Sequence, residues 1–245
     1  MAYFSDFPFT RYKFGNEVYS VLVQDISAYV DVIDSIKDGV AFYTTHYILE
    51  GDRPDSLSQR MYGTVDYYFT YYLMNDTIRE RGWPLTQKTL DKKVKEDYPN
   101  FTITTQDDLT GIMKVGENIV GNTSGATGTI LRRDLDLGQL IVNPTNSFTF
   151  QKNELIVILD EFGFARQSVT STAATSQWQS VRHYVDGDGQ RVDIDPLSDP
   201  PGIYTPVLYS EWYKEENDAI REIRVIRPSA MNSVMRAFRQ AIKST

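Results

Sequence analysis

The sequence predicts a mixed α+β protein assembled from several modules. Two segments near the start and one at the end place apolar residues at helical spacing, and the middle consists of short β-rich runs separated by Gly, Asn and Pro. The composition fits folded modules, since 41% of the 245 residues are hydrophobic and 13% are aromatic. That much apolar material can fill packed cores, and it argues against a disordered chain.

The charge and the cysteine content exclude several classes of function for this protein. The net charge is −8, with no basic run, so the chain is a poor candidate for binding nucleic acid or an anionic membrane. It has no cysteine, which excludes disulfides, thiolate zinc sites and cysteine nucleophiles. The first residues lack the pattern of a signal peptide, and no run approaches the ~20 apolar residues of a membrane span. We therefore expect a protein that is made and folds in a reducing cytoplasm.

Residues 1–37 are expected to form an aromatic N-terminal arm followed by a strand. The arm, "YFSDFPFTRYKF", carries six aromatic side chains, and "EVYSVLVQDI" has the β-branched content of a strand. Aromatic side chains in an arm can cover the protein's own core or dock on a neighbouring protein, and the sequence leaves both open. The candidate interaction residues of the arm are Phe4, Phe7 and Phe9.

Residues 38–86 are predicted to hold a strand and two helices. "GVAFYTTHYILEG" reads as the strand, and the first helix lies inside "GDRPDSLSQRMYG". Asp52 and Asp55 are expected to accept hydrogen bonds from the free amides of its first turn, where Pro54 is tolerated. Gly63 supplies the left-handed residue that ends it. The carboxylates are therefore predicted to be helix caps rather than catalytic groups.

The second helix is expected over "TVDYYFTYYLMND". Val65, Phe69 and Leu73 lie four residues apart, and tyrosines fill the flanks. A helix that is apolar around most of its circumference is either central to its domain or in contact with another chain. "GWPL" then looks extended. The candidate interaction residues of this module are Arg53, Tyr67, Tyr71 and Trp83.

The order strand, helix, Tyr-Gly, helix and extended exit, with "YILEGD", "LSQRMYG" and "YYLMN", resembles the LysM module. The resemblance implies a small βααβ fold within residues 38–86, in which a later Asn ends the second helix. The sequence departs from the usual pattern at "RPDS", where LysM modules more often have a Thr-Leu beginning. Because LysM modules typically bind N-acetylglucosamine chains, the resemblance also implies carbohydrate binding as one possible function.

Residues 87–110 are predicted to form a connecting helix, and residues 111–162 a small all-β insertion module. Within the module, "VGENIVG" and "QKNELIVI" echo each other, each a turn with Glu followed by a strand. "GNTSGATG" is rich in glycine but lacks the Lys and the following Ser/Thr of a nucleotide-binding loop. It is interpreted as a flexible hairpin tip.

Residues 163–180 are interpreted as a Ser/Thr-rich linker, and residues 181–245 as an α/β C-terminal segment with a hairpin, a loop and a terminal helix. "VDGDGQRVDID" raises a calcium hypothesis, but the Glu that completes a calcium loop is missing, which favours a hairpin turn at Asp-Gly. Apolar residues at helical spacing after Pro228 predict the terminal helix, whose stripe is core or a docking surface. The candidate interaction residues here are Met231, Met235 and Phe238.

No pattern nominates a catalytic centre. The two histidines, His46 and His183, sit in strand-like runs with no second ligand at metal spacing. There is no Gly-x-Ser-x-Gly elbow, and no two carboxylates are singled out for acid and base roles. We expect no enzyme, no catalytic residue, no cofactor and no metal site.

Several stretches together resemble the baseplate wedge subunit 53 family of contractile-tailed bacteriophages, of the T-even type and their cyanophage relatives. They are the aromatic start, "ILEGDRPDSLSQRMYG", "YYLMNDTIRERGWPL" and "NDAIREIRVIRPSAMNSVMRAF". The β-rich middle of the chain looks like an insertion. The positions that match the family's pattern are Gly51, Arg53, Pro54, Tyr62, Gly63, Asn75, Trp83 and Pro84.

This resemblance implies a structural protein of the virion, made in the host cytoplasm, that clamps neighbouring wedges of the tail baseplate around the central hub. The implied partners are other wedge proteins, hub or tube-proximal proteins and neighbouring wedges, without nucleic acid or membrane. Two alternatives remain open: a carbohydrate-binding protein that recognises N-acetylglucosamine-containing cell-wall glycan, and a peptidoglycan hydrolase. Buried tyrosines would favour the clamp, and exposed aromatics beside "GDRPDS" and after the second helix would favour a glycan site.

Overall fold

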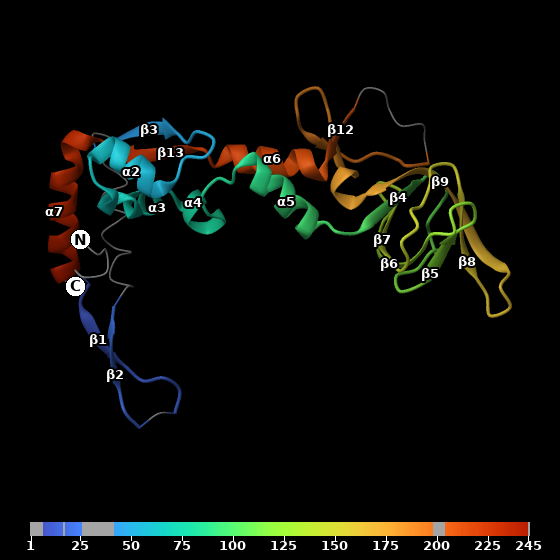
Figure 1. Cartoon of the computed structure of the whole chain (residues 1–245), viewed down its shortest axis with the longest axis horizontal. Helices are drawn as coiled ribbons and strands as arrows, with labels where there is room; N and C mark the ends of the chain where they lie inside the picture. The colour runs from blue at the N-terminus through green and yellow to red at the C-terminus, as the bar shows by residue number, and fades with distance from the viewer. Residues whose placement is uncertain (1–6, 17, 26–41, 198–203, 245) are drawn as a thin grey trace. The chain divides into compact units, whose positions relative to one another are not determined.

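The computed structural model describes residues 7–16, 18–25, 42–197 and 204–244, and within these ranges the chain is a mixed α+β protein (Figure 1). It divides into two compact units. Unit 1 combines residues 1–86 with residues 216–245, and unit 2 consists of residues 87–215. Unit 2 is therefore inserted into unit 1 in the chain.

The described residues of unit 1 form two separate two-stranded sheets and several helices. β1 pairs with β2, and β3 pairs with β13, both antiparallel. The elements are β1 (Phe9–Tyr12), β2 (Val21–Gln24), β3 (Tyr43–Tyr47), α2 (Pro54–Tyr62), the 3-10 helix η4 (Val65–Tyr67), α3 (Phe69–Met74), α4 (Asp76–Arg81), β13 (Glu222–Ile226) and α7 (Pro228–Ser244).

The first helix begins and ends where the sequence predicts, but its N-cap differs. Pro54 opens α2, and Gly63 closes it with φ 74° and an amide that donates to the Gln59 carbonyl. The N-cap is Arg53, which makes no side-chain cap hydrogen bond, so the expectation for Asp52 was wrong. The Asp52 carboxylate instead accepts from the Leu49 amide and pairs with Arg60, whose Nη2 lies 2.7 Å from its Oδ2. The Asp52 carboxylate binds the Arg60 guanidinium in preference to the neutral amides of the first turn of α2, because a hydrogen bond between two charged groups is stronger.

The second helix is shorter than predicted. Residues 65–74 form a 3-10 turn and then α3, because Thr64 caps the turn by accepting the Asp66 amide. α3 stops at Met74, followed by Asn75 in extended conformation, and a further helix, α4, precedes "GWPL". The later Asn therefore does end the second helix.

The βααβ order expected within residues 38–86 is not observed. The strand that pairs with β3 is β13, from residues 222–226, and residues 82–86 are irregular. β13 alternates buried and exposed positions, with Ile223 and Val225 buried against the helices. This amphipathic strand fits the edge of β3 better than the segment with Pro84, because proline cannot donate to a ladder.

Among the described residues of unit 1, buried apolar side chains gather in two clusters. One joins α3, β13 and α7, and the other joins the residues around α2, α3 and β13. The predicted stripe of the terminal helix belongs to the first cluster, so it is core. Its members within the described side chains are Met231, Val234, Met235 and Phe238.

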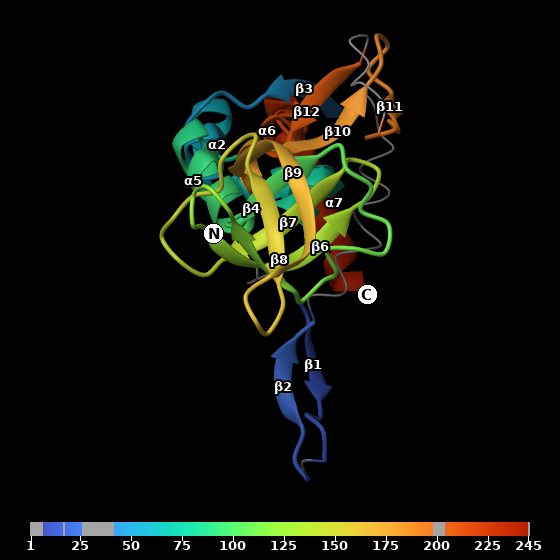
Figure 2. The same ribbon diagram turned by 90° about the vertical axis from the view of Figure 1, so that its right-hand side faces the viewer.

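Unit 2 is built on a closed antiparallel barrel of six strands in the order β4-β7-β6-β5-β8-β9 (Figure 2). The helix α5 (Gln87–Asp97) precedes it, and the apolar side chains of alternate strand positions fill the inside. The strands are β4 (Phe101–Thr105), β5 (Asn118–Gly121), β6 (Thr127–Asp134), β7 (Gln139–Pro144), β8 (Leu155–Leu159) and β9 (Ala165–Ser176).

The barrel extends beyond residues 111–162 at both ends. The predicted connecting helix ends at Asp97, and β4 lies in what was assigned to the connector. The predicted linker, residues 163–180, is the long strand β9, which pairs with both β4 and β8. Composition was misleading here because Ser and Thr are compatible with a strand whose neighbours supply the core, and Val169 and Ser171 of β9 are buried.

The C-terminal segment is divided between the units. β10 (Val181–Val185) pairs with β11 (Arg191–Val192) around the predicted Asp-Gly turn, and with β12 (Thr205–Leu208). The Asp186 carboxylate accepts the amides of Asp188 and Gln190, which confirms the turn. The sequence did not predict α6 (Tyr209–Ala219), a helix that crosses the boundary between the two units.

Candidate functional site: exposed aromatic hairpins

The β1–β2 hairpin presents apolar side chains on both of its faces. Its register places Phe9 opposite Gln24 and Tyr12 opposite Val21. Because side chains alternate along a strand, Phe9 and Tyr12 lie on opposite faces. Phe9 is 62% exposed and Tyr12 54%. Even if one face of this two-stranded sheet packs against the protein, the apolar side chains of its other face stay exposed.

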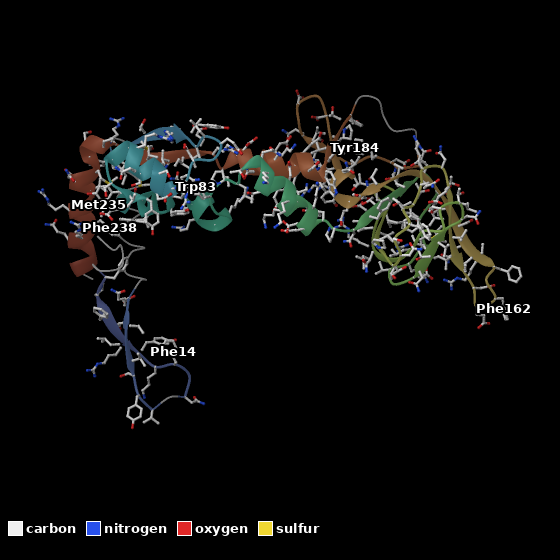
Figure 3. The ribbon with its side chains drawn as sticks, in the orientation of Figure 1. Phe14, Trp83, Phe162, Tyr184, Met235 and Phe238 are labelled. Atoms are coloured by element: carbon white, nitrogen blue, oxygen red, sulfur yellow. The ribbon has the colours of Figure 1, made fainter. Side chains whose placement is uncertain are left out.

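The hairpin continues this character toward its tip. Phe14, labelled in Figure 3, contacts Tyr12 edge-to-face with 4.9 Å between the ring centroids. Val18 and Tyr19 are exposed as well. In the described part of the chain, β1 and β2 pair only with each other. A lone two-stranded hairpin is marginally stable in water, so this one gains most from a partner surface.

A second exposed aromatic pair lies at the tip between β8 and β9. Phe162 is 76% exposed and Phe164 73%, and Figure 3 shows Phe162 at the end of this hairpin. The Asp160 Oδ1 accepts both of their amides, at 2.9 Å and 2.8 Å. Gly163 completes the turn with φ 84°. The backbone that carries the two rings is therefore held in a defined turn, which lowers the entropy lost when this tip binds a partner.

The sequence-predicted interaction residues divide into exposed and buried sets. Phe9 and Arg53 are exposed, and Phe4 lies outside the described residues. Phe7 is buried and meets Phe238 edge-to-face, with 6.4 Å between centroids. The remaining buried members are Tyr71, Met231, Met235 and Phe238, and the half-buried ones are Tyr67 and Trp83. Within the arm, Phe7 covers the protein's own core, and Phe9 is exposed.

The rings around α2 and α3 are committed to internal packing. Tyr71 is fully buried and stacks on Tyr62, with 6.2 Å between centroids. Trp83 lies against Tyr71 and Tyr72, and its Nε1 donates to the Asp52 carbonyl at 2.7 Å. Burial raises the pKa of Tyr71. Tyr71 therefore has no face free for a stacked sugar, while Tyr72 and Trp83 are partly buried.

Both histidines have a lowered pKa. The pKa of His46 is lowered by burial and then by the Arg60 charge. The pKa of His183 is lowered by burial and then by Arg182. Across the described ranges no group of His, Asp and Glu is arranged to hold a metal ion. None of the helices in those ranges has the length and apolar character that a membrane crossing needs.

The sequence reasoning missed Phe162 and Phe164 because they lie at the junction between the predicted β module and the predicted linker, which begins at residue 163. The signal that could have found them is "DEFGFA", an Asp-to-Gly turn with aromatics on either side of the glycine. In comparisons with protein-family models and with curated proteins, nothing matches this chain.

Proposed function

We propose that this protein is a structural subunit of a phage tail baseplate, which clamps neighbouring wedge subunits together around the central hub. It would be made in the host cytoplasm and end in the virion, without enzymatic activity. Its partners would be other wedge proteins, hub or tube-proximal proteins and neighbouring wedges. A LysM-like arrangement of β3, α2, α3 and β13 would act as scaffold.

The observation that carries the proposal is the two-faced β1–β2 hairpin. Exposed aromatic and aliphatic side chains on both faces suit insertion between two protein surfaces, because such anchors provide most of the affinity of protein interfaces. Arg11 and Lys13 add positive charge to this exposed segment of an otherwise acidic chain. The Phe162 and Phe164 tip supplies a second anchor on the other unit, and linked anchors increase avidity.

The glycan-binding alternative is less favoured by the packing of Tyr71 and Trp83. It requires exposed rings beside "GDRPDS" and after the second helix, and Tyr71 is buried while Trp83 is hydrogen-bonded within the fold. We therefore do not propose it, and the experiment below measures it directly.

The test is a pull-down of the tagged full chain from lysate of phage-infected host cells. Bound material is divided between mass spectrometry and amino-sugar analysis. The test variant is Phe9→Ser, Tyr12→Ser and Leu22→Ser on the hairpin. The control variant is Val115→Ser, Leu131→Ser and Leu135→Ser, which changes three exposed apolar residues of unit 2.

We expect baseplate and tail proteins with the wild type and the control, no amino sugar, and about tenfold or greater loss with the hairpin variant. Recovery of wall fragments without tail proteins would overturn the proposal in favour of glycan binding. Equal recovery of tail proteins by the hairpin variant would remove the hairpin from the interface.

A further inference from the structure

The two outer edges of the β3–β13 sheet differ. Along β13, the backbone groups that point away from β3 are bound by side chains of unit 1. The Asn75 side chain exchanges two hydrogen bonds with the backbone of Arg224, and the Tyr62 hydroxyl donates to the Ile226 carbonyl. This edge of the sheet is therefore closed by the protein itself.

The register of β3 decides which of its backbone groups face outward. At one end of the ladder the Ile48 amide donates to the Arg221 carbonyl, and at the other end the Arg227 amide donates to the Phe42 carbonyl. Hydrogen-bonded pairs alternate along an antiparallel ladder, so the even-numbered residues of β3 bond to β13. The backbone groups of its odd-numbered residues therefore point away from β13.

The odd-numbered residues, Tyr43, Thr45 and Tyr47, leave an open row of backbone groups along β3. The Tyr43 carbonyl accepts from Arg227 Nε at 3.1 Å. Within the described part of the chain, the three amides and the other two carbonyls of this row have no partner. Thr45 and Tyr47 are exposed, and Figure 1 shows β3 along the margin of unit 1 with β13 to one side of it. Such an edge is a template for a further strand.

The open edge of β3 lacks the features that keep strands apart. Proteins protect exposed edges with charges, prolines or bulges. Residues 42–49, "FYTTHYIL", contain no Lys, Arg, Asp, Glu or Pro, and the pairing of β3 with β13 runs without a bulge. The neutral edge also matters because the protein carries a net charge of −8. Two copies can therefore approach each other here without bringing like charges into contact.

We infer that β3 pairs with β3 of a second copy of this chain. In an antiparallel register centred on Thr45, Thr45 lies opposite its own copy and Tyr43 lies opposite Tyr47. Each outward amide then meets an outward carbonyl, which gives the reciprocal contacts that a two-fold interface requires. Thr-Thr and aromatic cross-strand pairs add stability. The spacing Tyr-x-Thr-x-Tyr makes this edge complementary to itself, which selects a second copy over an unrelated strand.

The dimer should be weak and reversible. The contact rests on one pair of five-residue strands, which is smaller than a standard protein interface. This self-association goes beyond the proposed function and does not depend on it. The hairpin pull-down and the experiments below can therefore fail independently of each other.

The first test is sedimentation velocity of the full chain between about 5 and about 500 µM. Thr45→Lys places two positive charges face to face across the two-fold axis, and Thr45→Pro removes the central amide donor. The control is Thr77→Lys, the same charge change at an exposed position of α4. The hairpin variant Phe9→Ser/Tyr12→Ser/Leu22→Ser identifies any association through β1 and β2. Circular dichroism checks folding, and Thr45→Lys decides the test if Thr45→Pro does not fold.

We expect a monomer–dimer equilibrium in the wild type. The association constant should fall about tenfold or more in the Thr45 variants and stay within about twofold in Thr77→Lys and the hairpin variant. Equal association by the Thr45 variants, or association lost only in the hairpin variant, would overturn the inference. A chain that is monomeric at every concentration would also overturn it and would leave the edge to a strand of another protein.

The second test measures the register and uses the absence of cysteine from the chain. In the inferred pairing the two Thr45 Cα atoms lie about 5.5 Å apart, a distance that a disulfide can span. Thr45→Cys should therefore form a covalent dimer in oxidised glutathione, seen on a non-reducing gel. Thr77→Cys is the control and should not. Equal yields of covalent dimer from the two variants would contradict the pairing of β3 with its copy.

Discussion

At the scale of single residues, Asn75 joins parts of unit 1 that are far apart in the chain. Its Nδ2 donates to the carbonyls of Tyr71 and Arg224, each at 2.8 Å, and its Oδ1 accepts the Arg224 amide at 2.7 Å. The side chain thus ends α3 and fixes β13 beside it. A buried amide with this many partners leaves several backbone groups unpaired when it is removed.

We predict that Asn75→Ala lowers the free energy of unfolding of unit 1 by about 3 kcal/mol. Urea denaturation followed by circular dichroism measures this change. Thr77→Ala, at an exposed position on α4, should stay within about 0.5 kcal/mol of the wild type. Equal stability of the two variants would contradict the bridging role of Asn75.

Tyr62 makes the stability of unit 1 sensitive to alkaline pH. Its hydroxyl donates to the Ile226 carbonyl at 2.8 Å, and burial raises its pKa from 10.0 to about 12. The fold therefore favours the protonated phenol. The contribution of the protonated phenol to the free energy of unfolding is complete below pH 10. It is lost as the pH rises from 10 to about 12, by at most about 1.4 kcal/mol per pH unit.

Tyr62→Phe should lower the free energy of unfolding by about 1 kcal/mol at pH 7, because the hydrogen bond to the Ile226 carbonyl is lost. Above pH 10 the free energy of unfolding of the variant should fall less steeply with pH than that of the wild type. Urea denaturation at pH 7, 10 and 11 provides the comparison. A slope remains in the variant because burial also raises the pKa of Tyr71. If the free energy of unfolding of the variant falls as steeply with pH as that of the wild type, Tyr62 does not contribute to the loss of stability at alkaline pH.

At the scale of elements, the echo seen in the sequence is a structural repeat. In each copy a Glu accepts the amide three residues before it, from Lys114 to Glu117 and from Gln151 to Glu154, and a strand follows. The two strands, β5 and β8, pair with each other. Glu154 is buried and also accepts the Thr123 and Ser124 amides, so it holds the "GNTSGATG" tip in place.

Glu154→Ala should lower the free energy of unfolding of unit 2 by about 3 kcal/mol and release the tip. Hydrogen exchange read by mass spectrometry should show faster exchange over residues 121–126. Glu161→Ala, at the exposed β8–β9 tip, is the control and should leave this exchange unchanged. Continued protection in Glu154→Ala would mean that backbone hydrogen bonds alone order the tip.

At the scale of the whole molecule, the ends of the insertion are joined within unit 1. The Leu85 amide donates to Asn217 Oδ1 at 2.7 Å, and Asn217 Nδ2 donates to the Leu85 carbonyl at 3.2 Å. The Arg221 guanidinium also donates to the Leu85 carbonyl. The chain therefore leaves unit 1 and returns to it at nearly the same point, an arrangement that tolerates insertion and deletion.

Replacement of residues 87–215 by a short Gly-Ser linker should leave unit 1 folded, since β3 and β13 keep all their pairing. Closing a shorter loop also costs less entropy. One cooperative unfolding transition in calorimetry would support this view. A shortened chain without such a transition would show that unit 1 depends on unit 2.

The sequence by itself determined the features that depend on near neighbours. These include the ends of α2 at Pro54 and Gly63, the Asp-Gly turn, the helix α7 with its apolar stripe and the mixed α+β class. Proline, glycine and helical spacing act within a few residues, so they can be read locally. The aromatic arm was also visible, although not which of its rings face outward.

Only the tertiary structure decided the features that depend on distant partners. Asp52 pairs with Arg60 instead of capping, β13 replaces a local strand beside β3, and the Ser/Thr-rich segment becomes β9 because β4 and β8 flank it. The strand that pairs with a given strand, and the group that pairs with a given charge, depend on which parts of the chain the fold brings close together. Spacing along the sequence does not predict those contacts.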